Sequence, residues 1–170
     1  MRSFLAPLTA ALLAAPLAAQ QKHPITFDDF AAVRAVGDPQ LSPDGKVVLY
    51  SVRTTDVSKN TRASHTVSVP IGGGAAQAFP ANAADVAATE ARWSPDGKYV
   101  AFIAGGQLWV AEPSGAGRKQ LTHLNGGATG PVWAPTSDRI AFTSAVYPEC
   151  SNDACNAAKE KATADNIANV

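Results

Sequence analysis

Three histidines, His23, His65 and His123, are the side chains of this 170-residue sequence best suited to transfer protons near neutral pH. Serine hydrolysis would need one of them beside a serine nucleophile and a carboxylate. The sequence contains no Gly-x-Ser-x-Gly nucleophile elbow and no His-Gly-Gly segment for an oxyanion hole. We therefore assign no catalytic residue and expect the histidines to lie at the surface or in turns.

The two cysteines, Cys150 and Cys155, lie five residues apart. A pair of thiols without a further Cys or a nearby His makes a poor zinc site. In an oxidising compartment, a local disulfide is the natural interpretation. The alternative is that both remain free thiols or bind a metal loosely.

Glycine runs and aspartates are the remaining candidates for ligand binding. Glycine runs occupy residues 72–74, 105–106 and 126–127. None of them is followed by the Gly-Lys-Ser/Thr of a phosphate-binding loop. Asp44, Asp96 and Asp138 could suggest calcium, but each sits in a turn, where aspartate is favoured for local hydrogen bonding, and none belongs to a ligand-rich loop. We predict neither a cofactor nor a metal ion.

Composition restricts the class of partner. Lysine plus arginine and aspartate plus glutamate number 14 each, so the chain lacks the positive field on which non-specific nucleic-acid binding depends. Hydrophobic residues make up 46% of the sequence and charged residues 16%, which is typical of a chain that buries a core. We therefore expect a globular protein that binds no nucleic acid.

The N-terminus is typical of an export signal. Arg2 precedes an apolar stretch over residues 4–17, and LAA at residues 17–19 offers small residues for cleavage before Gln20. The stretch contains two prolines and is shorter than the about 20 apolar residues that span a membrane. We predict that residues 1–19 are a signal peptide and that the mature protein is exported, to the periplasm or the outside, with no membrane attachment. The alternative is an uncleaved anchor.

The most informative feature is an internal repeat. Residues 41–50 (LSPDGKVVLY) recur as residues 93–102 (WSPDGKYVAF), and a diverged copy occupies residues 133–142 (WAPTSDRIAF). A type I turn favours Ser, Pro and Gly at its first, second and fourth positions, and a β-branched or aromatic run follows each copy of the turn. Each copy therefore predicts two strands joined by a turn. The predicted turn residues of the two full copies are Pro43, Asp44, Gly45, Pro95, Asp96 and Gly97.

Further similarity extends each unit to four strands, because the strand pattern of residues 66–79 recurs over residues 107–121. The polar residues 54–64 are predicted to be a loop insertion between the second and third strands of the first unit. Four short strands at a period of about 40 to 45 residues are typical of a propeller blade. A β-sandwich is the alternative, although a sandwich has no need to repeat its turn chemistry. The tryptophans expected to fill gaps between blades, with ligand stacking as the alternative, are Trp93, Trp109 and Trp133.

We predict an all-β fold, an incomplete β-propeller of about three four-stranded blades that follows the signal peptide and a short helix. Thr26 and Asp29 form a capping-box pattern that predicts the helix over residues 27–36. Propellers close with about four to eight blades, so about three cannot complete a ring. The chain is then the front part of a longer protein, or completes its ring with a partner. The predicted segments are residues 20–37 for the linker and helix, 38–149 for the partial propeller with blades at about 38–80, 90–122 and 129–149, and 150–170 for a cysteine-pair loop and a truncated tail.

Together these features resemble a known family. The signal peptide, TFDDF at residues 26–30, DPQLSPDGK at residues 38–46 and the WSPDGK repeat are similar to the N-terminal propeller of exported S9-family serine peptidases. That family comprises the prolyl oligopeptidases, dipeptidyl peptidases and acylaminoacyl peptidases. Single repeats also resemble the WD40-like (PD40) repeats of periplasmic TolB propellers. Cysteine pairs after the third blade, like Cys150 and Cys155, resemble those of exported members of the peptidase family.

The resemblance implies a role for the chain and a partner. In the family, the propeller gates a C-terminal α/β-hydrolase domain that carries the Ser, Asp and His triad and acts on short peptides. This chain would then be inactive alone, and its partner would be the hydrolase domain of the same polypeptide. The alternative is a TolB-like module that binds other proteins and has no catalytic role.

Overall fold

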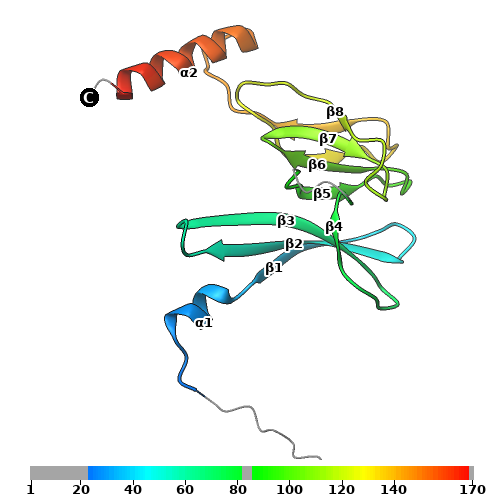
Figure 1. Ribbon diagram of the computed structural model, residues 1–170. Helices are drawn as coiled ribbons and strands as arrows, with labels where there is room; N and C mark the ends of the chain where they lie inside the picture. The colour runs from blue at the N-terminus through cyan, green and yellow to red at the C-terminus, as the bar shows by residue number, and fades with distance from the viewer. Residues whose placement is uncertain (1–22, 82–85, 169–170) are drawn as a thin grey trace, which may run out of the picture.

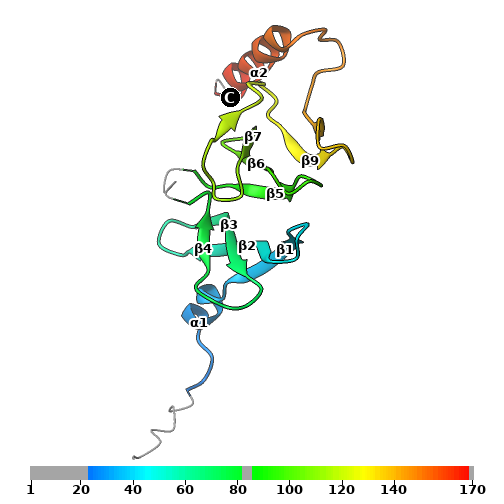
Figure 2. The same cartoon turned by 90° about the vertical axis from the view of Figure 1, so that its right-hand side faces the viewer.

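The computed structural model describes residues 23–81 and 86–168. The predicted signal peptide, residues 1–19, lies outside the described residues. Three antiparallel sheets lie one after another along the molecule, with the helix α1 at one end and the helix α2 at the other (Figure 1 and Figure 2). Sequence order therefore becomes spatial order, as in a stack of blades.

The helix α1, Phe27–Ala32, begins with the capping box that the sequence predicts. The Thr26 hydroxyl accepts a hydrogen bond from the backbone N–H of Asp29 at 3.2 Å, and the Asp29 carboxylate accepts one from the backbone N–H of Thr26 at 2.8 Å. The helix does not reach residue 36 as predicted. Val33 is already extended, because the following residues pair with the first sheet instead of continuing the helix.

The first sheet has four strands in the order β1-β2-β3-β4, and we call it blade 1. Its strands are β1 (Ala35–Leu41), β2 (Val47–Asp56), β3 (Thr61–Pro70) and β4 (Gln77–Phe79). The loop insertion predicted at residues 54–64 is wrong, because β2 and β3 pair without a break from Val47↔Pro70 to Asp56↔Thr61. The polar residues there extend a hairpin into solvent, and polarity alone does not prevent strand pairing.

The second sheet repeats this order as β5-β6-β7-β8, and we call it blade 2. Its strands are β5 (Thr89–Trp93), β6 (Val100–Ala104), β7 (Gln107–Ala111) and β8 (Lys119–Gln120). The third sheet pairs β9 (Thr129–Trp133) with β10 (Ile140–Thr143), and these two strands are the described part of blade 3. Residues 144–149, which the sequence assigned to the third blade, are not in a strand.

The hydrophobic core lies between successive blades. Leu49 and Phe79 of blade 1 pack against Val100 and Phe102 of blade 2 in one cluster of buried side chains. Blade 2 turns its other face to blade 3, and the members of that second cluster are Ala101, Ile103, Leu108 and Ala128, with the partly buried Trp133 and Ile140 packed against them. Every residue of β6 is buried, as expected of a short apolar strand covered on both faces.

The helix α2, Asp153–Ala168, occupies the region that the sequence predicts to be a tail. Its alanine-rich composition favours a helix, whereas it lacks the periodic apolar face that would reveal one. Among residues 153–165 of α2, Asn156 is buried, with 6% of its surface exposed. Neither described helix has the length and apolar character needed to cross a membrane.

Candidate functional site

The first repeat turn is closed by its serine. The Ser42 carbonyl accepts a hydrogen bond from the N–H of Gly45 at 2.9 Å, and Gly45 has a φ of +71°, which favours glycine. The Ser42 hydroxyl donates to Asp44 at 2.6 Å and accepts from the N–H of Val47 at 3.0 Å. Hydrogen bonds from Ser42 and then from the N–H of Lys46 hold the pKa of Asp44 below its ordinary value.

The second repeat turn has the same geometry. The N–H of Gly97 donates to the Ser94 carbonyl at 2.9 Å, and the Ser94 hydroxyl donates to Asp96 at 2.7 Å and accepts from the N–H of Tyr99 at 3.0 Å. The pKa of Asp96 is likewise lowered, chiefly by Ser94 and then by the N–H of Lys98. Both aspartates therefore serve the turn itself, and no group of three or more potential metal ligands occurs among the described residues.

The third turn keeps the backbone of the other two with different side chains. The N–H of Ser137 donates to the Ala134 carbonyl at 2.9 Å, and Ser137 holds a φ of +62° where the other copies carry glycine. The Thr136 hydroxyl donates to Asp138, and this is the main cause of the lowered pKa of Asp138. The Ser137 hydroxyl accepts from the N–H of Asp96 at 3.1 Å, which ties the third turn to the second.

Two tryptophans join neighbouring blades. The Trp93 indole N–H donates to the Gln40 carbonyl at 3.2 Å, from blade 2 to blade 1. The Trp133 indole N–H donates to the Arg92 carbonyl at 3.0 Å, from blade 3 to blade 2. Both acceptors precede the repeat turn by two residues, so the same bond is made at successive interfaces.

Trp109 has a different position. Its indole N–H donates to the Ala104 carbonyl at 3.1 Å, inside blade 2. Its ring stacks on Phe102 with the ring centroids 6.5 Å apart and packs against the core between blades 1 and 2. These indoles therefore hold blades together, and each indole N–H has a protein acceptor.

A β-bulge in the first strand of each blade makes a second set of contacts, which the sequence reasoning missed. Asp38, Glu90 and Gly130 all have positive φ, at +50°, +52° and +60°, and each lies at a break in register. The Asp38 carboxylate binds the Arg92 guanidinium at 2.7 Å, and the Glu90 carboxylate accepts from the N–H of Gly130 at 2.6 Å. Their recurrence at the repeat spacing is the signal that could have identified them.

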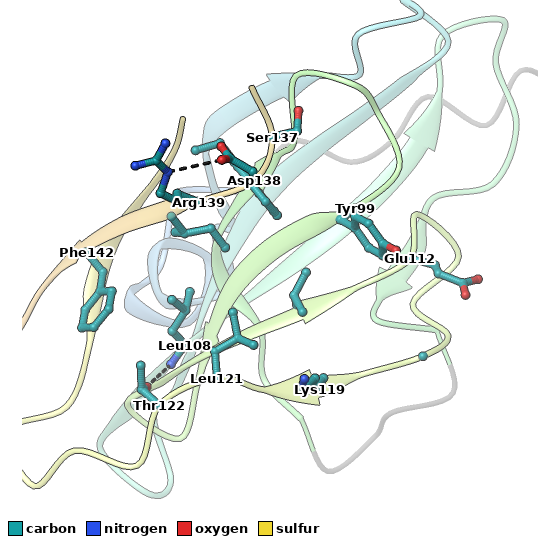
Figure 3. A pocket seen from close by; sticks show the side chains of 14 residues that line it. Tyr99, Leu108, Glu112, Lys119, Leu121, Thr122, Ser137, Asp138, Arg139 and Phe142 are labelled. Atoms are coloured by element: carbon teal, nitrogen blue, oxygen red, sulfur yellow. Dashed lines mark hydrogen bonds and ion pairs between the residues drawn. The ribbon is translucent and has the colours of Figure 1, made fainter. Parts of the chain in front are cut away.

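A groove between blade 2 and β10 is the main candidate site for a ligand or partner. It has a volume of about 610 Å³. Figure 3 shows Phe142 on one side of this space, with Leu108 and Leu121 facing it from β7 and from the residue after β8. Charged side chains of both signs line the groove as well, namely Glu112, Lys119, Asp138 and Arg139. The site is thus apolar at its centre, with charges that largely compensate one another.

The cysteines lie beyond this groove, at the start of α2. Cys150 and Cys155 form a disulfide with their Cα atoms 5.4 Å apart. The Asn156 side-chain oxygen accepts from the N–H of Tyr147 at 2.9 Å, and Asp153 accepts from the N–H of Asn125 at 3.1 Å. These contacts anchor the first turn of α2 to the loops that follow β8 and β10.

The histidines form no hydrolytic arrangement. The His23 ring lies 3.7 Å from the Asp29 carboxylate near the start of α1, His65 stands opposite Val52 in blade 1, and His123 is exposed. No hydrogen bond joins a serine to a histidine within residues 23–81 and 86–168. This part of the chain therefore offers packing surfaces and no nucleophile–base pair.

Sequence comparison identifies peptidases as relatives, although no protein-family model matches the chain. The uncharacterized peptidase YuxL of Bacillus subtilis is 31% identical over 129 residues, which cover 72% of this chain and 19% of the relative. Dipeptidyl-peptidase 5 of Porphyromonas gingivalis is 35% identical over 125 residues, covering 70% of this chain and 18% of the relative. Dipeptidyl-peptidase 5 of Porphyromonas endodontalis is 26% identical over 158 residues, which cover 84% of this chain and 23% of the relative. The chain thus spans about a fifth of the length of these relatives.

Solved structures support the fold. Acylaminoacyl peptidase of Pyrococcus horikoshii matches 72% of this chain, and 19% of its own, with a TM-score of 0.58 and 21% identity. The putative TolB of Agrobacterium tumefaciens matches 71% of this chain, and 41% of its own, with a TM-score of 0.51 and 20% identity. The β-propeller domain of the Trilobed protease from Pyrococcus furiosus matches 66% of this chain, and 34% of its own, with a TM-score of 0.50 and 22% identity.

These matches confirm the predicted all-β, incomplete β-propeller. They also confirm that the chain resembles the propeller part of S9-type peptidases and the TolB-type propeller repeats.

Proposed function

We propose that this chain forms the first blades of the propeller of an exported S9-type serine peptidase, and that the propeller restricts access to a hydrolase domain elsewhere in the same polypeptide. The observation that carries the proposal is the pair of stacked four-stranded blades in a chain whose relatives are peptidases about five times as long as the matched region.

The chemistry is divided between two parts of such an enzyme. A serine of the hydrolase domain attacks the peptide carbonyl, a histidine takes the serine proton, and an aspartate orients that histidine. The described part of this chain contributes the wall around the reaction. Blades locked to each other by tryptophans, by bulge carboxylates and by a buried aromatic core suit a barrier that must keep its shape while substrates pass.

The direct test uses the complete gene product. We expect it to hydrolyse aminoacyl or dipeptidyl p-nitroanilides, and we expect alanine in place of the serine of a downstream Gly-x-Ser-x-Gly elbow to abolish this activity. A variant without residues 35–143 tests gating, since it should gain activity on long polypeptides relative to short peptides. A folded complete product with no hydrolysis of these substrates would contradict the proposal.

Export is tested separately. Mass spectrometry of protein recovered from the periplasm or medium should give an N-terminus at Gln20, as expected after removal of residues 1–19. Recovery of the protein from membranes with its first 19 residues still attached would support the alternative of an uncleaved anchor.

A TolB-like binding module is the second candidate. It is favoured by the TM-score of 0.51 to the putative TolB, which is matched over 71% of this chain. In that case, pull-down from a periplasmic extract should recover a protein partner, and the complete gene product should hydrolyse none of the peptide substrates above.

A further inference from the structure

We infer that a pocket beside the repeat turns binds an uncharged, proline-containing segment of another polypeptide. This pocket lies between residues 40–43, 92–95 and 131–133, and we call it the turn pocket. Its volume is about 390 Å³, which falls in the range of small-ligand sites, and Trp133 is the one residue that it shares with the groove beside β10. The inference goes beyond the proposed function, because it concerns the three described blades and needs no hydrolase domain.

The repeat brings equivalent residues of three blades to the turn pocket. The first strands β1, β5 and β9 follow one another on one side of the molecule, with contacts from each to the next (Figure 2). The last two residues before each repeat turn line the pocket, namely Gln40 and Leu41, Arg92 and Trp93, and Val132 and Trp133. The stacking of blades therefore builds this pocket, and no single loop does.

Apolar side chains of the turn pocket remain in contact with water. Trp93 and Trp133 each donate their indole N–H to a backbone carbonyl of the preceding blade, so the rings offer the pocket carbon surface and no hydrogen-bond donor. Leu41 and Val132 line the same pocket and keep 56% and 63% of their surfaces exposed. An apolar ligand would therefore bury surface that the described residues leave uncovered.

The polar character of the turn pocket comes from one side chain. Among the described residues that line the pocket, Arg92 alone carries a charge. Its Nη1 donates to the Asp38 carboxylate at 2.7 Å and to the Ala91 carbonyl at 2.8 Å, so its charge is already balanced. No described residue accepts a hydrogen bond from its Nε or Nη2. The pocket therefore favours neither sign of charge in its ligand, but it retains N–H donors for a neutral acceptor.

A proline-containing peptide matches this combination of indole surface and unused donors. Proline has no backbone N–H, so a chain that contains several prolines presents carbonyl oxygens and few donors. Such chains also keep an extended polyproline II conformation and dock in grooves lined by aromatic side chains. In the turn pocket, one proline ring lies against the indoles while an Arg92 N–H donates to a carbonyl of the peptide. A carboxylate is disfavoured there, because the like charge of Asp38 lies beside Arg92.

The test measures binding of a rhodamine-labelled neutral peptide, GLPPLPG with an amidated C-terminus, to the 170-residue chain by fluorescence anisotropy. We expect saturable binding at one site. Binding should weaken about tenfold when alanine replaces the three prolines of the peptide, because the rings that pack on the indoles are lost and three N–H donors are gained.

Variants of the chain place the peptide in the turn pocket. Leu41→Ser and Val132→Ser each remove an exposed apolar side chain from the pocket and should weaken binding about fivefold. Arg92→Lys keeps the positive charge beside Asp38 but removes Nε and Nη2, and it should weaken binding about tenfold. Ile71→Ser is the matched control, since Ile71 is 62% exposed and lies outside the pocket, and it should leave binding unchanged.

The absence of saturable binding would overturn the inference, as would equal binding of the proline and alanine peptides. An equal loss in the Leu41→Ser and Ile71→Ser chains would place the peptide elsewhere and overturn it too. Tighter binding of a peptide with glutamate in place of its second leucine would do the same, because Arg92 would then act as an unbalanced charge. Peptide hydrolysis plays no part in this assay, so a chain that binds no peptide leaves the proposed function standing.

Discussion

Two phenylalanines at equivalent places in successive blades allow the packing between blades to be measured. Phe102 of blade 2 is fully buried, whereas Phe142 of blade 3 keeps 37% of its surface exposed. Replacing each with alanine removes the same atoms from the same position of the repeat. The difference between the two losses of stability therefore reports what the neighbouring strand and blade contribute.

The structure sets the expected sizes. Truncation of a fully buried phenylalanine costs about 3–5 kcal/mol, and Phe102 also loses its stacking on Trp109 and its edge contact with Phe79. Phe142 loses only partial burial, so Phe142→Ala should cost about 1–2 kcal/mol. We expect a difference of about 2–3 kcal/mol in the free energy of unfolding.

The assay is urea unfolding of the 170-residue chain, followed by tryptophan fluorescence, with the slope against urea compared between variants. If Phe102→Ala and Phe142→Ala lower the free energy of unfolding by amounts that agree within about 0.5 kcal/mol, the packing described for the two side chains would be refuted, because the two sites would then be equally buried.

The remaining predictions concern the contacts of the repeat. Trp133→Phe should lower the free energy of unfolding by about 1 kcal/mol in the same urea assay, because the Arg92 carbonyl loses the indole N–H that donates to it at 3.0 Å. An unchanged free energy of unfolding would show that water replaces this hydrogen bond. Ser94→Ala should cost about 1–3 kcal/mol, because it removes a hydroxyl of a fully buried residue that accepts from the N–H of Tyr99 and leaves that N–H without this acceptor. Retention of full stability would contradict this role. The pKa of Asp96 is lower in the folded state than in the unfolded state, so its stabilising effect is present at neutral pH and is lost as the pH falls below about 4 towards the folded-state pKa. Asp96→Asn should flatten part of the decline in thermal midpoint below about pH 4, and an identical decline in the variant would count against the assignment.

The strands next to the turns could be predicted because turn chemistry is local. Ser, Pro, Asp and Gly close the same hydrogen bonds wherever they occur in this order, and the structure shows those bonds in both full copies. The number of copies of the turn then predicted the number of blades. The third copy keeps the turn without its serine and glycine, because Ser137 adopts the positive φ and the backbone bond to Ala134 remains.

Other features could not be read from local patterns. Residues 54–64 are polar because they form a solvent-exposed hairpin end, and polarity does not distinguish such strands from loops. The helix α2 lacks an apolar stripe, so periodicity gave no sign of it. Asp38 lies in a bulge and binds Arg92 of the following blade, 54 residues away, so no local pattern indicates this contact. The groove depends on how blades stack, which no single segment determines.

The tryptophan and bulge contacts between blades nevertheless share one origin, the first strand of each blade. In blade 1 this strand offers the Gln40 carbonyl to an indole and the Asp38 carboxylate to Arg92. In blade 2 it offers the Arg92 carbonyl to an indole and the Glu90 carboxylate to a backbone N–H. Each first strand thus supplies acceptors for the next blade, two residues apart, and the bulge between them turns both toward the same neighbour. Because the donors lie on the following blade, these contacts specify the order of the blades as well as their spacing.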